Sequence, residues 1–434
     1  MIKPQNLEEK VVWYTIIGTY GLYFLGALHL VIPAIAWFLG FYLCIKLWQQ
    51  TETTPTEERI KIPLGVWVWI MAMLVIEVAL VMGHLDFGMA DRLGKSTINF
   101  FVRTWALLAL FPLIGCLKIR PQLIYRAVCI LCLQCLFFIG VGYAAVAANL
   151  PEPLFLSPLY KIGGVGELYY NVTLYGFDGE TENESVRLVL FTPWAPALGL
   201  VGNIYFWLTS QESNPRWRWM GMVSSVAMVF VSVSRLGLLS LVVVPVLVWL
   251  LGNLARPSLQ ITSGVICFLG GLFGSQVLDL LQNFREGFDR QRRGSSNVRA
   301  MLARISLERW WNEAPIWGHG ILEPRGPEAT TYKPIGSHHL WFGLLFTHGI
   351  VGFLAVAFAM SWSFIDLLIK VKDSRTAQIG LAILLVLFLF SFAENLEVIA
   401  YVYWPGLIIL GLALNEKREL ISSKKVQGLS LSQG

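Results

Sequence analysis

Apolar runs long enough to cross a lipid bilayer recur from one end of the sequence to the other. A membrane-spanning helix needs about 20 predominantly apolar residues. The chain of 434 residues is 56% hydrophobic and 14% charged, whereas soluble domains average about 25% charged residues. So few charged side chains cannot cover a soluble surface. The pattern therefore predicts an all-α, polytopic membrane protein.

We expect about twelve membrane-spanning helices, and no removable signal peptide because no small-residue cleavage site follows Lys10. The expected spans are 12–28, 31–48, 63–84, 98–117, 123–148, 189–209, 217–234, 236–252, 259–281, 339–369, 377–393 and 397–414. With that number, both termini and the even-numbered connections share one side. Those connections are short and rich in Lys and Arg, so the positive-inside rule predicts that this side is cytoplasmic.

The expected organisation is a single transmembrane domain, 1–434, with a polar cytoplasmic tail at 415–434. Two long connections, 149–188 and 282–338, lie on the opposite side of the membrane. The second of these external segments is basic. It contains Arg285, Arg290, Arg292, Arg293, Arg299, Arg304, Arg309, Arg325 and Lys333. Long loops cross a membrane regardless of their charge, so the topology stands, but the arginines need an explanation.

Arg299 differs from the other arginines of the 282–338 segment. Most of them have an acidic residue three or four positions away, as expected on a solvated helix. Arg299 has none. The stretch Gly294–Asn297 is typical of a helix start, which would place Arg299 in a first turn beside unpaired backbone N–H groups. This setting favours a phosphate site, and an arginine that faces solvent or lipid headgroups is the alternative.

Two further segments combine charge or proton chemistry with apolar surroundings. Arg235 lies between two apolar spans with no acidic residue within ten positions. A charge in a membrane costs several kcal/mol unless it is paired or faces water, so Arg235 is a candidate site residue, with snorkelling to the headgroups as the alternative. His338 and His339 stand where the chain re-enters the membrane. Histidine is suited to proton transfer near neutral pH, and a structural role is equally open.

Carboxylates elsewhere supply alternative assignments. Glu394, Glu397 and Asp86 could act as the catalytic base instead of a histidine. We expect Glu77 and Arg103, at similar depth on successive helices, to form a structural ion pair.

The sequence contains no nucleotide-binding or histidine-rich metal motif. Cys129, Cys132 and Cys135 have the spacing of a metal motif but lack a neighbouring histidine or acid, so small buried side chains are expected there. We expect no metal, no cofactor and no nucleic-acid partner.

Four stretches together resemble the O-antigen ligase and O-antigen polymerase family. VSVSRLGLLSLVV, residues 231–243, resembles the family's SRxG-type helix motif. SSNVRAMLARISLERWWNEAPIWGHG, residues 295–320, resembles its arginine, apolar helix and P-x-x-G-x-G. SHHLWFGLLFTHGIVG, residues 337–352, resembles its S-H-N…G-L-x-G segment, with His339 in place of Asn. ESVRLVLFTPWAPALG, residues 184–199, is similar to a diverged form of its R-x-x-G-x-F-x-x-P-N segment.

The resemblance implies a fold similar to that of membrane glycosyltransferases with polyprenyl-linked donors. It implies a glycan donor on undecaprenyl diphosphate and a glycan or lipid-linked acceptor. It further implies metal-independent, inverting transfer on the periplasmic face of the bacterial inner membrane. By matching position, Arg235 and Arg299 would bind the diphosphate and His338 would act near the acceptor hydroxyl. The other expected substrate-binding residues are Arg187, Arg292, Arg304, Ser296 and His339.

Three functions remain open on the sequence. A polymerase of surface polysaccharide is slightly preferred, because the spacing of Arg309 and Gly320 is similar to a pattern seen in polymerases. A ligase that moves a finished O-antigen glycan to lipid A-core or to a protein is the alternative within the same class. A transporter of lipid-linked glycans is the alternative of another class, although no paired halves with interrupted helices are evident.

Overall fold

The computed structural model describes residues 2–416 except 52, 54, 56–58, 163–165, 178–185, 275, 277, 280, 281 and 283–292. The side chains of 293–296 also lie outside the description.

Helices dominate the described chain, and the few strands are short. The α-helices are α1 Leu7–Ile17, α2 Thr19–Phe24, α3 Leu28–Trp48, α4 Leu64–Asp86, α5 Leu93–Ser96, α6 Leu107–Ile114, α7 Pro121–Ala147, α8 Ala195–Ser210, α9 Pro215–Val231, α10 Arg235–Gly252, α11 Pro257–Leu272, α13 Arg293–Glu313, α14 Leu340–Lys370, α15 Arg375–Phe390 and α16 Ala400–Asn415. The 3₁₀ turns are η1 Ala90–Arg92, η3 Pro158–Ile162, η4 Glu167–Tyr169, η5 Glu328–Thr330 and η6 Glu397–Ile399, and η2 Thr97–Trp105 is a π-helix. The strands are β1 Pro153–Leu156, β2 Asn171–Thr173, β3 Tyr175–Phe177 and β4 Val186–Leu188.

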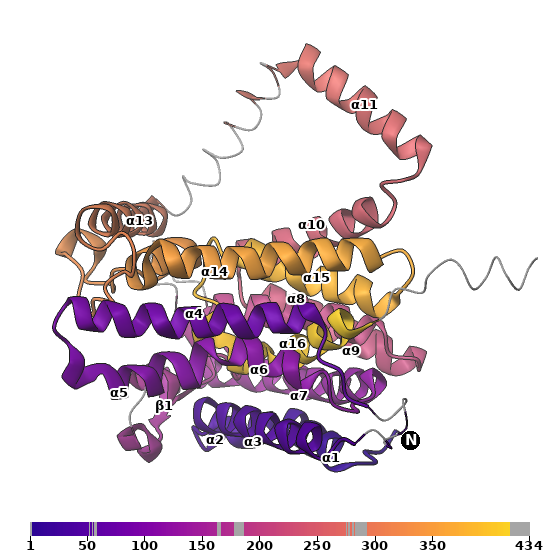
Figure 1. Cartoon of the computed structure of the whole chain (residues 1–434), viewed down its shortest axis with the longest axis horizontal. Coiled ribbons are helices and arrows are strands. Elements are labelled where there is room, and N and C mark those ends of the chain that lie inside the picture. The colour runs from indigo at the N-terminus through magenta and orange to yellow at the C-terminus, as the bar shows by residue number, and fades with distance from the viewer. Residues whose placement is uncertain are drawn as a thin grey trace, which may run out of the picture.

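The long helices lie side by side, and α5, α13 and the strands lie at one end of the bundle, whereas α11 stands apart from it (Figure 1). Helix α4 runs along α14, while α13 and β1 lie at the end opposite to the N-terminus. The strands form two antiparallel pairs, β1–β2 and β3–β4, within the connection between α7 and α8. The β1–β2 pair is fixed to the bundle by Tyr23, whose hydroxyl accepts a hydrogen bond from the backbone N–H of Thr173 at 2.8 Å.

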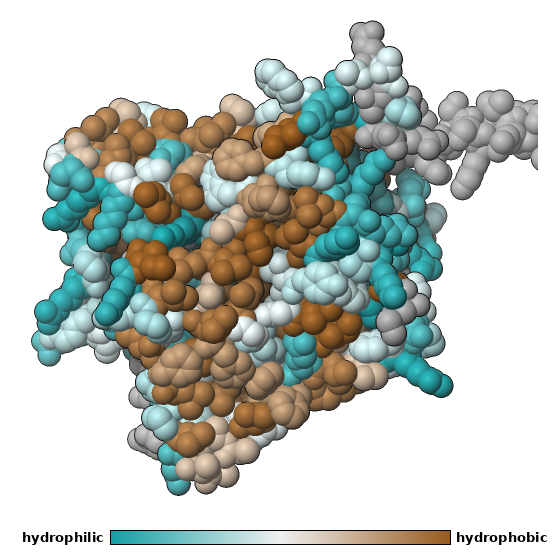
Figure 2. Space-filling view, turned by 90° about the horizontal axis from the view of Figure 1, so that it is seen from below, coloured by the Kyte–Doolittle hydropathy of each residue, from teal (hydrophilic) through white to brown (hydrophobic). Residues whose placement is uncertain are grey.

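Among the residues that the structure describes, six helices are long and apolar enough to cross a membrane, or up to seven if the bent pair Ala90–Trp105 and Leu107–Ile114 is one span. The six are α3, α4, α7, α10, α14 and η6–α16, and α11 and α15 are shorter apolar helices. The expectation of twelve spans is therefore not confirmed. Helices occupy the other expected ranges, but they are shorter or less apolar than a full crossing requires. Figure 2 shows a broad apolar band flanked by hydrophilic residues toward both ends, as a multi-pass membrane protein requires.

Three ion pairs join helix ends near the N-terminus of the chain. They are Lys46–Glu8 at 2.8 Å, Arg120–Glu9 at 2.7 Å and Arg126–Glu212 at 2.6 Å. Each acidic side chain is only 1% exposed. The cations belong to connections that the sequence assigns to the same side of the membrane. The structure thus brings these basic connections together, and a buried carboxylate holds each of them.

Helix α14 is broken at Gly349, and a loop replaces the lost hydrogen bonds. Gly349 has φ 60° and ψ −164°, a conformation that L side chains rarely adopt. The N–H groups of Ile350 and Val351, which a continuous helix would direct to residues 346 and 347, instead donate to the carbonyls of residues 315 and 316. The freed carbonyls of residues 346 and 347 accept from the N–H groups of His319 and Gly320, each at 2.8 Å. The P-x-x-G-x-G stretch therefore fills a gap in a membrane helix.

We expect Gly349→Ala to cost roughly 2–4 kcal/mol of stability, because the added Cβ would collide with the carbonyl of Ile316 at a backbone conformation that favours glycine. Thermal unfolding of the purified protein in lipid nanodiscs measures the loss. Gly140→Ala on α7 is the matched control, since a Cβ there meets no other group within 4 Å. Identical unfolding curves for the two variants would show that the break does not depend on the glycine.

Candidate functional site

Three residues with an unusual backbone conformation lie at or near expected site residues. Leu190, Val233 and His338 have φ values of 52°, 50° and 66°. Positive φ is uncommon for any side chain, and for a β-branched residue such as Val233 it is a genuine outlier. Such conformations persist only where the surroundings impose them, and they concentrate at functional sites. The three positions fall within three of the stretches that carry the family resemblance.

A buried carboxyl group lies between the stretches 184–199 and 295–320, two of the four that carry the family resemblance. Glu394, in the connection between α15 and η6, is 6% exposed, and its Oε2 accepts a hydrogen bond from Nε1 of Trp194 at 2.9 Å. Burial raises the pKa of Glu394 to about 7, although the nearby Arg299 guanidinium and the Trp194 bond act in the opposite direction. Trp194 is the N-cap of α8, and Arg299 is on α13. The carboxyl group thus connects elements that are distant in the sequence.

Arg235 is placed next to the same region by tight packing of two helix starts. It is the first residue of α10, and the N-cap Ser234 accepts a hydrogen bond from the N–H of Gly237 at 3.1 Å. Ser234 packs close to the start of α8, where a Cβ at Gly199, the fifth residue of this helix, would come within 2.8 Å of the Ser234 Cβ. Because Trp194 caps that helix, Arg235 and the Trp194–Glu394 pair lie at neighbouring helix ends.

The His338 ring is oriented by its neighbour so that one nitrogen can accept a proton. Ser337 Oγ donates its hydrogen to the carbonyl of Pro334 at 2.6 Å. The 2.6 Å contact between Ser337 Oγ and His338 Nδ1 therefore needs the ring proton on Nδ1. The lone pair of the neutral ring is then on Nε2. A histidine in this tautomer has the form required of a general base.

Hydrogen bonds from two other parts of the chain hold the turn that carries His338. Asn395 Nδ2 donates to the carbonyl of Gly336 and to Glu397 Oε1, each at 3.3 Å. On the α13 side, the N–H of Gly336 donates to Ser306 Oγ at 3.2 Å. The turn is consequently held between α13 and the connection before η6.

His339 caps α14 and lines a large apolar groove. Its side chain accepts a hydrogen bond from the N–H of Phe342 at 3.4 Å, and burial lowers the pKa of His339 to about 4. The ring is therefore neutral at pH 7. The groove has a volume of about 840 Å³ and lies between α10, α14 and α15. Apart from His339 and Ser361, only apolar side chains line it, among them Leu251, Met360 and Phe388.

The loop between α13 and α14 contains a buried histidine that no sequence pattern singled out. His319 is 7% exposed and stacks between Phe87 and Phe346, with ring centroids 4.9 and 4.3 Å away. Its Nδ1 contacts the carbonyl of Phe346 at 2.9 Å and its Nε2 contacts Glu313 Oε2 at 2.8 Å. Arg309 binds Glu313 and Glu323. These contacts hold α13 against α14. The guanidinium of Arg309 is therefore bound by two carboxylates of the protein itself.

The structure does not join every expected substrate-binding residue to this region. Arg304 is exposed, and at five positions from Arg299 it lies about 140° around α13. Arg187 is in the β3–β4 hairpin opposite Gly176, and no described contact connects it to Arg235 or Arg299. Asp86, at the end of α4, is exposed, and no described contact brings it to the site either.

Arg292 and the side chain of Ser296 lie outside the described residues.

Two local expectations are wrong. Helix α13 already includes Arg293, so Gly294–Asn297 is helical and Arg299 lies in the second turn or later, away from unpaired N–H groups. Glu77 does not show the expected pairing with Arg103, because its Oε1 accepts from Thr97 Oγ1 at 2.8 Å and its Oε2 is without a hydrogen-bond partner. In both cases the error came from inferring spatial neighbours from local spacing alone.

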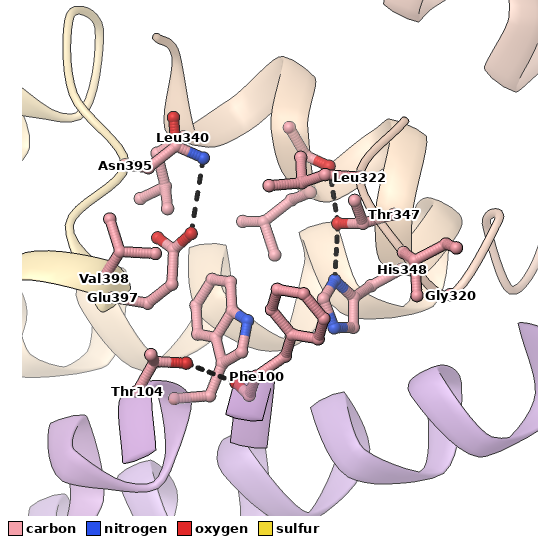
Figure 3. A pocket seen from close by; sticks show the side chains of 14 residues that line it. Phe100, Thr104, Gly320, Leu322, Leu340, Thr347, His348, Asn395, Glu397 and Val398 are labelled. Carbon is pink, nitrogen blue, oxygen red and sulfur yellow. Dashed lines mark hydrogen bonds between the residues drawn. The ribbon is translucent and has the colours of Figure 1, made fainter. Parts of the chain in front are cut away.

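The alternative base Glu397 lines a small, partly open cavity (Figure 3). The cavity also borders Asn395 and His348, and Glu397 is 6% exposed. Among the described residues, no group of three or more His, Cys, Asp or Glu side chains is placed to hold a metal ion. The described site therefore offers cations, a neutral histidine and buried carboxyl groups, a set suited to bind an anion and to accept a proton.

We expect Glu394→Gln to change how stability depends on pH. The folded-state pKa of Glu394 lies above the ordinary carboxyl value of 4.5, so the folded protein holds this proton more tightly than the unfolded chain. Stability should therefore fall as pH rises from about 4.5 to about 7, by up to about 3 kcal/mol. The Gln variant keeps an oxygen for Trp194 and should lack this decline. Melting temperatures between these pH values measure it, with the exposed Glu328→Gln as control. Parallel curves for wild type and Glu394→Gln would contradict the assignment.

A sequence model of the family described as O-antigen ligase matches residues 220–357, which is less than half of the chain. No curated protein matches the sequence. The matched stretch runs from α9 through Arg235, Arg299 and the P-x-x-G-x-G loop into α14 beyond the break at Gly349. It includes three of the four stretches that carried the resemblance, 231–243, 295–320 and 337–352. Residues 220–357 of this multi-pass membrane protein are therefore similar to the O-antigen ligase family.

Proposed function

We propose that the protein transfers a glycan from a polyprenyl diphosphate donor, undecaprenyl diphosphate by the family resemblance, to a hydroxyl group of an acceptor sugar. The observation that carries this proposal is the apolar groove of about 840 Å³ that reaches His339, next to His338. Few soluble substrates need so large an apolar surface inside a membrane bundle, whereas a polyprenyl chain does. The donor's reacting end would then lie at the end of the bundle that holds α13.

The diphosphate is the part of the donor that needs cations. Arg299 and Arg235 stand on helices whose ends lie near Glu394 and Trp194. Negative charge grows on the diphosphate as the glycosidic bond breaks, and a preformed cation at that position stabilises the transition state. Arginine suits this role because it stays protonated and can bind phosphate oxygens in a bidentate manner.

His338 acts as the general base in this proposal. The acceptor oxygen attacks the anomeric carbon opposite the diphosphate, a new C–O bond forms, and the bond to the phosphate oxygen breaks with its electron pair. The hydroxyl proton passes to Nε2, whose lone pair follows from the Ser337 contact. Attack from the opposite face inverts the anomeric centre. Glu394, held near Arg299, is the alternative base.

We place the site on the periplasmic side of the inner membrane and both termini in the cytoplasm. The basic connections that the ion pairs gather near the N-terminus support this orientation. In this arrangement 282–338 is the external catalytic loop, 149–188 is a second external loop and 415–434 is the cytoplasmic tail.

A polymerase and a ligase differ only in the acceptor. The preference for a polymerase depended on Arg309, and this side chain is bound to Glu313 and Glu323. The match to a family described as O-antigen ligase favours a ligase, which accepts a lipid-anchored or protein-bound glycan.

We expect Arg299→Ala and His338→Ala each to lower transfer by at least about 100-fold, through loss of a cation and of a base, respectively. The assay uses purified protein in nanodiscs with a lipid-diphosphate-linked repeat unit, first alone and then with candidate acceptors. A product ladder with the donor alone indicates a polymerase, and product only with an acceptor indicates a ligase. His338→Ala should keep donor binding, whereas Arg299→Ala should weaken it.

Arg325→Ala is the control for that experiment, because Arg325 lies in the same external segment and packs on Tyr332, 4.7 Å from the ring centroid. If both site variants transfer glycan as well as this control does, the assigned residues are wrong. If wild-type protein moves the lipid-linked glycan across a vesicle membrane and transfers none, the protein is a transporter.

We expect Ala357→Trp, which fills the groove, to raise KM for a long-chain polyprenyl donor about tenfold. KM for a donor with a short lipid should change little, because a short lipid occupies less of the groove. Leu354→Trp is the matched control, as Leu354 is on the same helix, 57% exposed, and does not line the groove. Equal changes in KM for both donors would show that the groove does not bind the donor's lipid chain.

A further inference from the structure

A small, partly open cavity of about 30 Å³ lies where four segments meet, next to the Asn395 side chain that binds the carbonyl of Gly336. Its walls come from η2, from the loop at Gly320–Leu322, from the first half of α14 and from the residues around η6. In Figure 3, Asn395 and Glu397 lie on one side of the cavity, while Thr347 and His348 lie on the other. The cavity thus separates two polar groups inside an otherwise apolar interior.

Three buried polar atoms on this cavity have no hydrogen-bond partner among the protein atoms. They are Glu397 Oε2, Asn395 Oδ1 and His348 Nε2. Glu397 and His348 are 6% and 3% exposed. Buried polar groups are nearly always hydrogen-bonded, because an unsatisfied one costs about 1–3 kcal/mol. Three such atoms around one cavity therefore point to a ligand that satisfies them.

The hydrogen-bond pattern shows that His348 Nε2 and Asn395 Oδ1 are acceptors, and Glu397 Oε2 is an acceptor as well when the carboxyl group is ionised. Thr347 Oγ1 donates its single hydrogen to the carbonyl of Gly343 at 2.7 Å, so the 2.7 Å contact with His348 Nδ1 needs the ring proton on Nδ1. His348 Nε2 then carries a lone pair. Asn395 Nδ2 faces only acceptors, so the other amide atom is the oxygen. The missing partner must consequently be a donor.

We propose that this cavity is a water-binding site in which one or two water molecules bridge Glu397 and Asn395 to His348. Water fits in volume, since one molecule needs at least about 10–15 Å³ of such space. It also fits in chemistry, because each molecule supplies two O–H donors to groups that only accept.

The water site makes Asn395 a positioning residue for His338, a consequence that rests on the proposed function. Water at Oδ1 and the Glu397 contact together fix the Asn395 amide, whose N–H groups hold the carbonyl of Gly336. Gly336 has φ 87° and begins the turn that reaches His338. The bound water thereby keeps the turn from Gly336 to His338 in one conformation.

An electron cryo-microscopy map of the protein in nanodiscs, at a resolution that shows ordered water, tests the site without any activity. We expect density within hydrogen-bond distance of Glu397 Oε2 and of His348 Nε2. An empty cavity overturns the proposal. Density that appears only in sodium buffer and is lost when choline replaces sodium also overturns it, because the ligand is then a cation.

Asn395→Asp tests the positioning role, since Asp lacks the two N–H donors and places a second carboxyl group beside Glu397. We expect kcat to fall roughly ten- to hundredfold while KM for the donor stays unchanged, because the base is displaced and the groove is intact. Ser240→Ala is the control, as its buried Oγ also lacks a hydrogen-bond partner but lies away from the cavity.

Glu397→Gln provides a milder variant if Asn395→Asp does not fold. It retains Oε1 as an acceptor for Asn395 and replaces Oε2 with a donor, so the bridging water must reorient and a smaller fall in kcat is expected. Unchanged kcat in the folded variants removes the positioning role. If wild-type protein shows no transfer, the proposed function fails, and the map still decides whether the cavity binds water.

Discussion

The exchange of hydrogen bonds at Gly349 is the constraint on which the rest of the described site depends. Two donors and two acceptors of α14 leave the helix pattern and pair with the loop at Pro315–Gly320. Inside a membrane protein, irregular backbone is tolerated only where other protein groups satisfy it, and this loop does so. The loop follows α13 directly, so the same bonds hold α13 over the end of the bundle. Together with the Ser306–Gly336 bond, they keep Arg299 close to Glu394.

Burial of a carboxyl group and strained backbone conformations occur together in the site next to this loop. Glu394 stays buried because Trp194 and Arg299 compensate part of its desolvation. Val233 and His338 hold positive φ values that neither side chain prefers, and packing against neighbouring helices maintains them. A site assembled in this way is preorganised, because its groups are in place before a substrate binds. Preorganised charge is the main source of transition-state stabilisation in many enzymes.

Sequence reasoning selected Arg235, Arg299 and His338 from rules about isolated charges and proton chemistry, and the structure places all three near one end of the bundle. It missed His319, Trp194 and Asn395. These three act through contacts with chain segments far away in sequence, such as the Trp194–Glu394 bond across 200 positions. Local spacing carries no information about such contacts. The same limitation explains two wrong expectations, the start of α13 and the pairing of Glu77 with Arg103, since both were inferred from neighbours along the chain.

The sequence by itself determined that this is a helical, multi-pass membrane protein and that residues 220–357 are similar to the O-antigen ligase family. Apolar run length and motif order are properties of the chain, and the bilayer selects helices because each satisfies its own backbone hydrogen bonds. Only the tertiary structure decided which helices are long enough to cross, where α14 breaks, and that an apolar groove reaches His339. It alone placed Glu394 near Arg299 and the acceptor atoms around the buried cavity. These features arise from packing between distant segments, and that packing exists only once the helices have assembled.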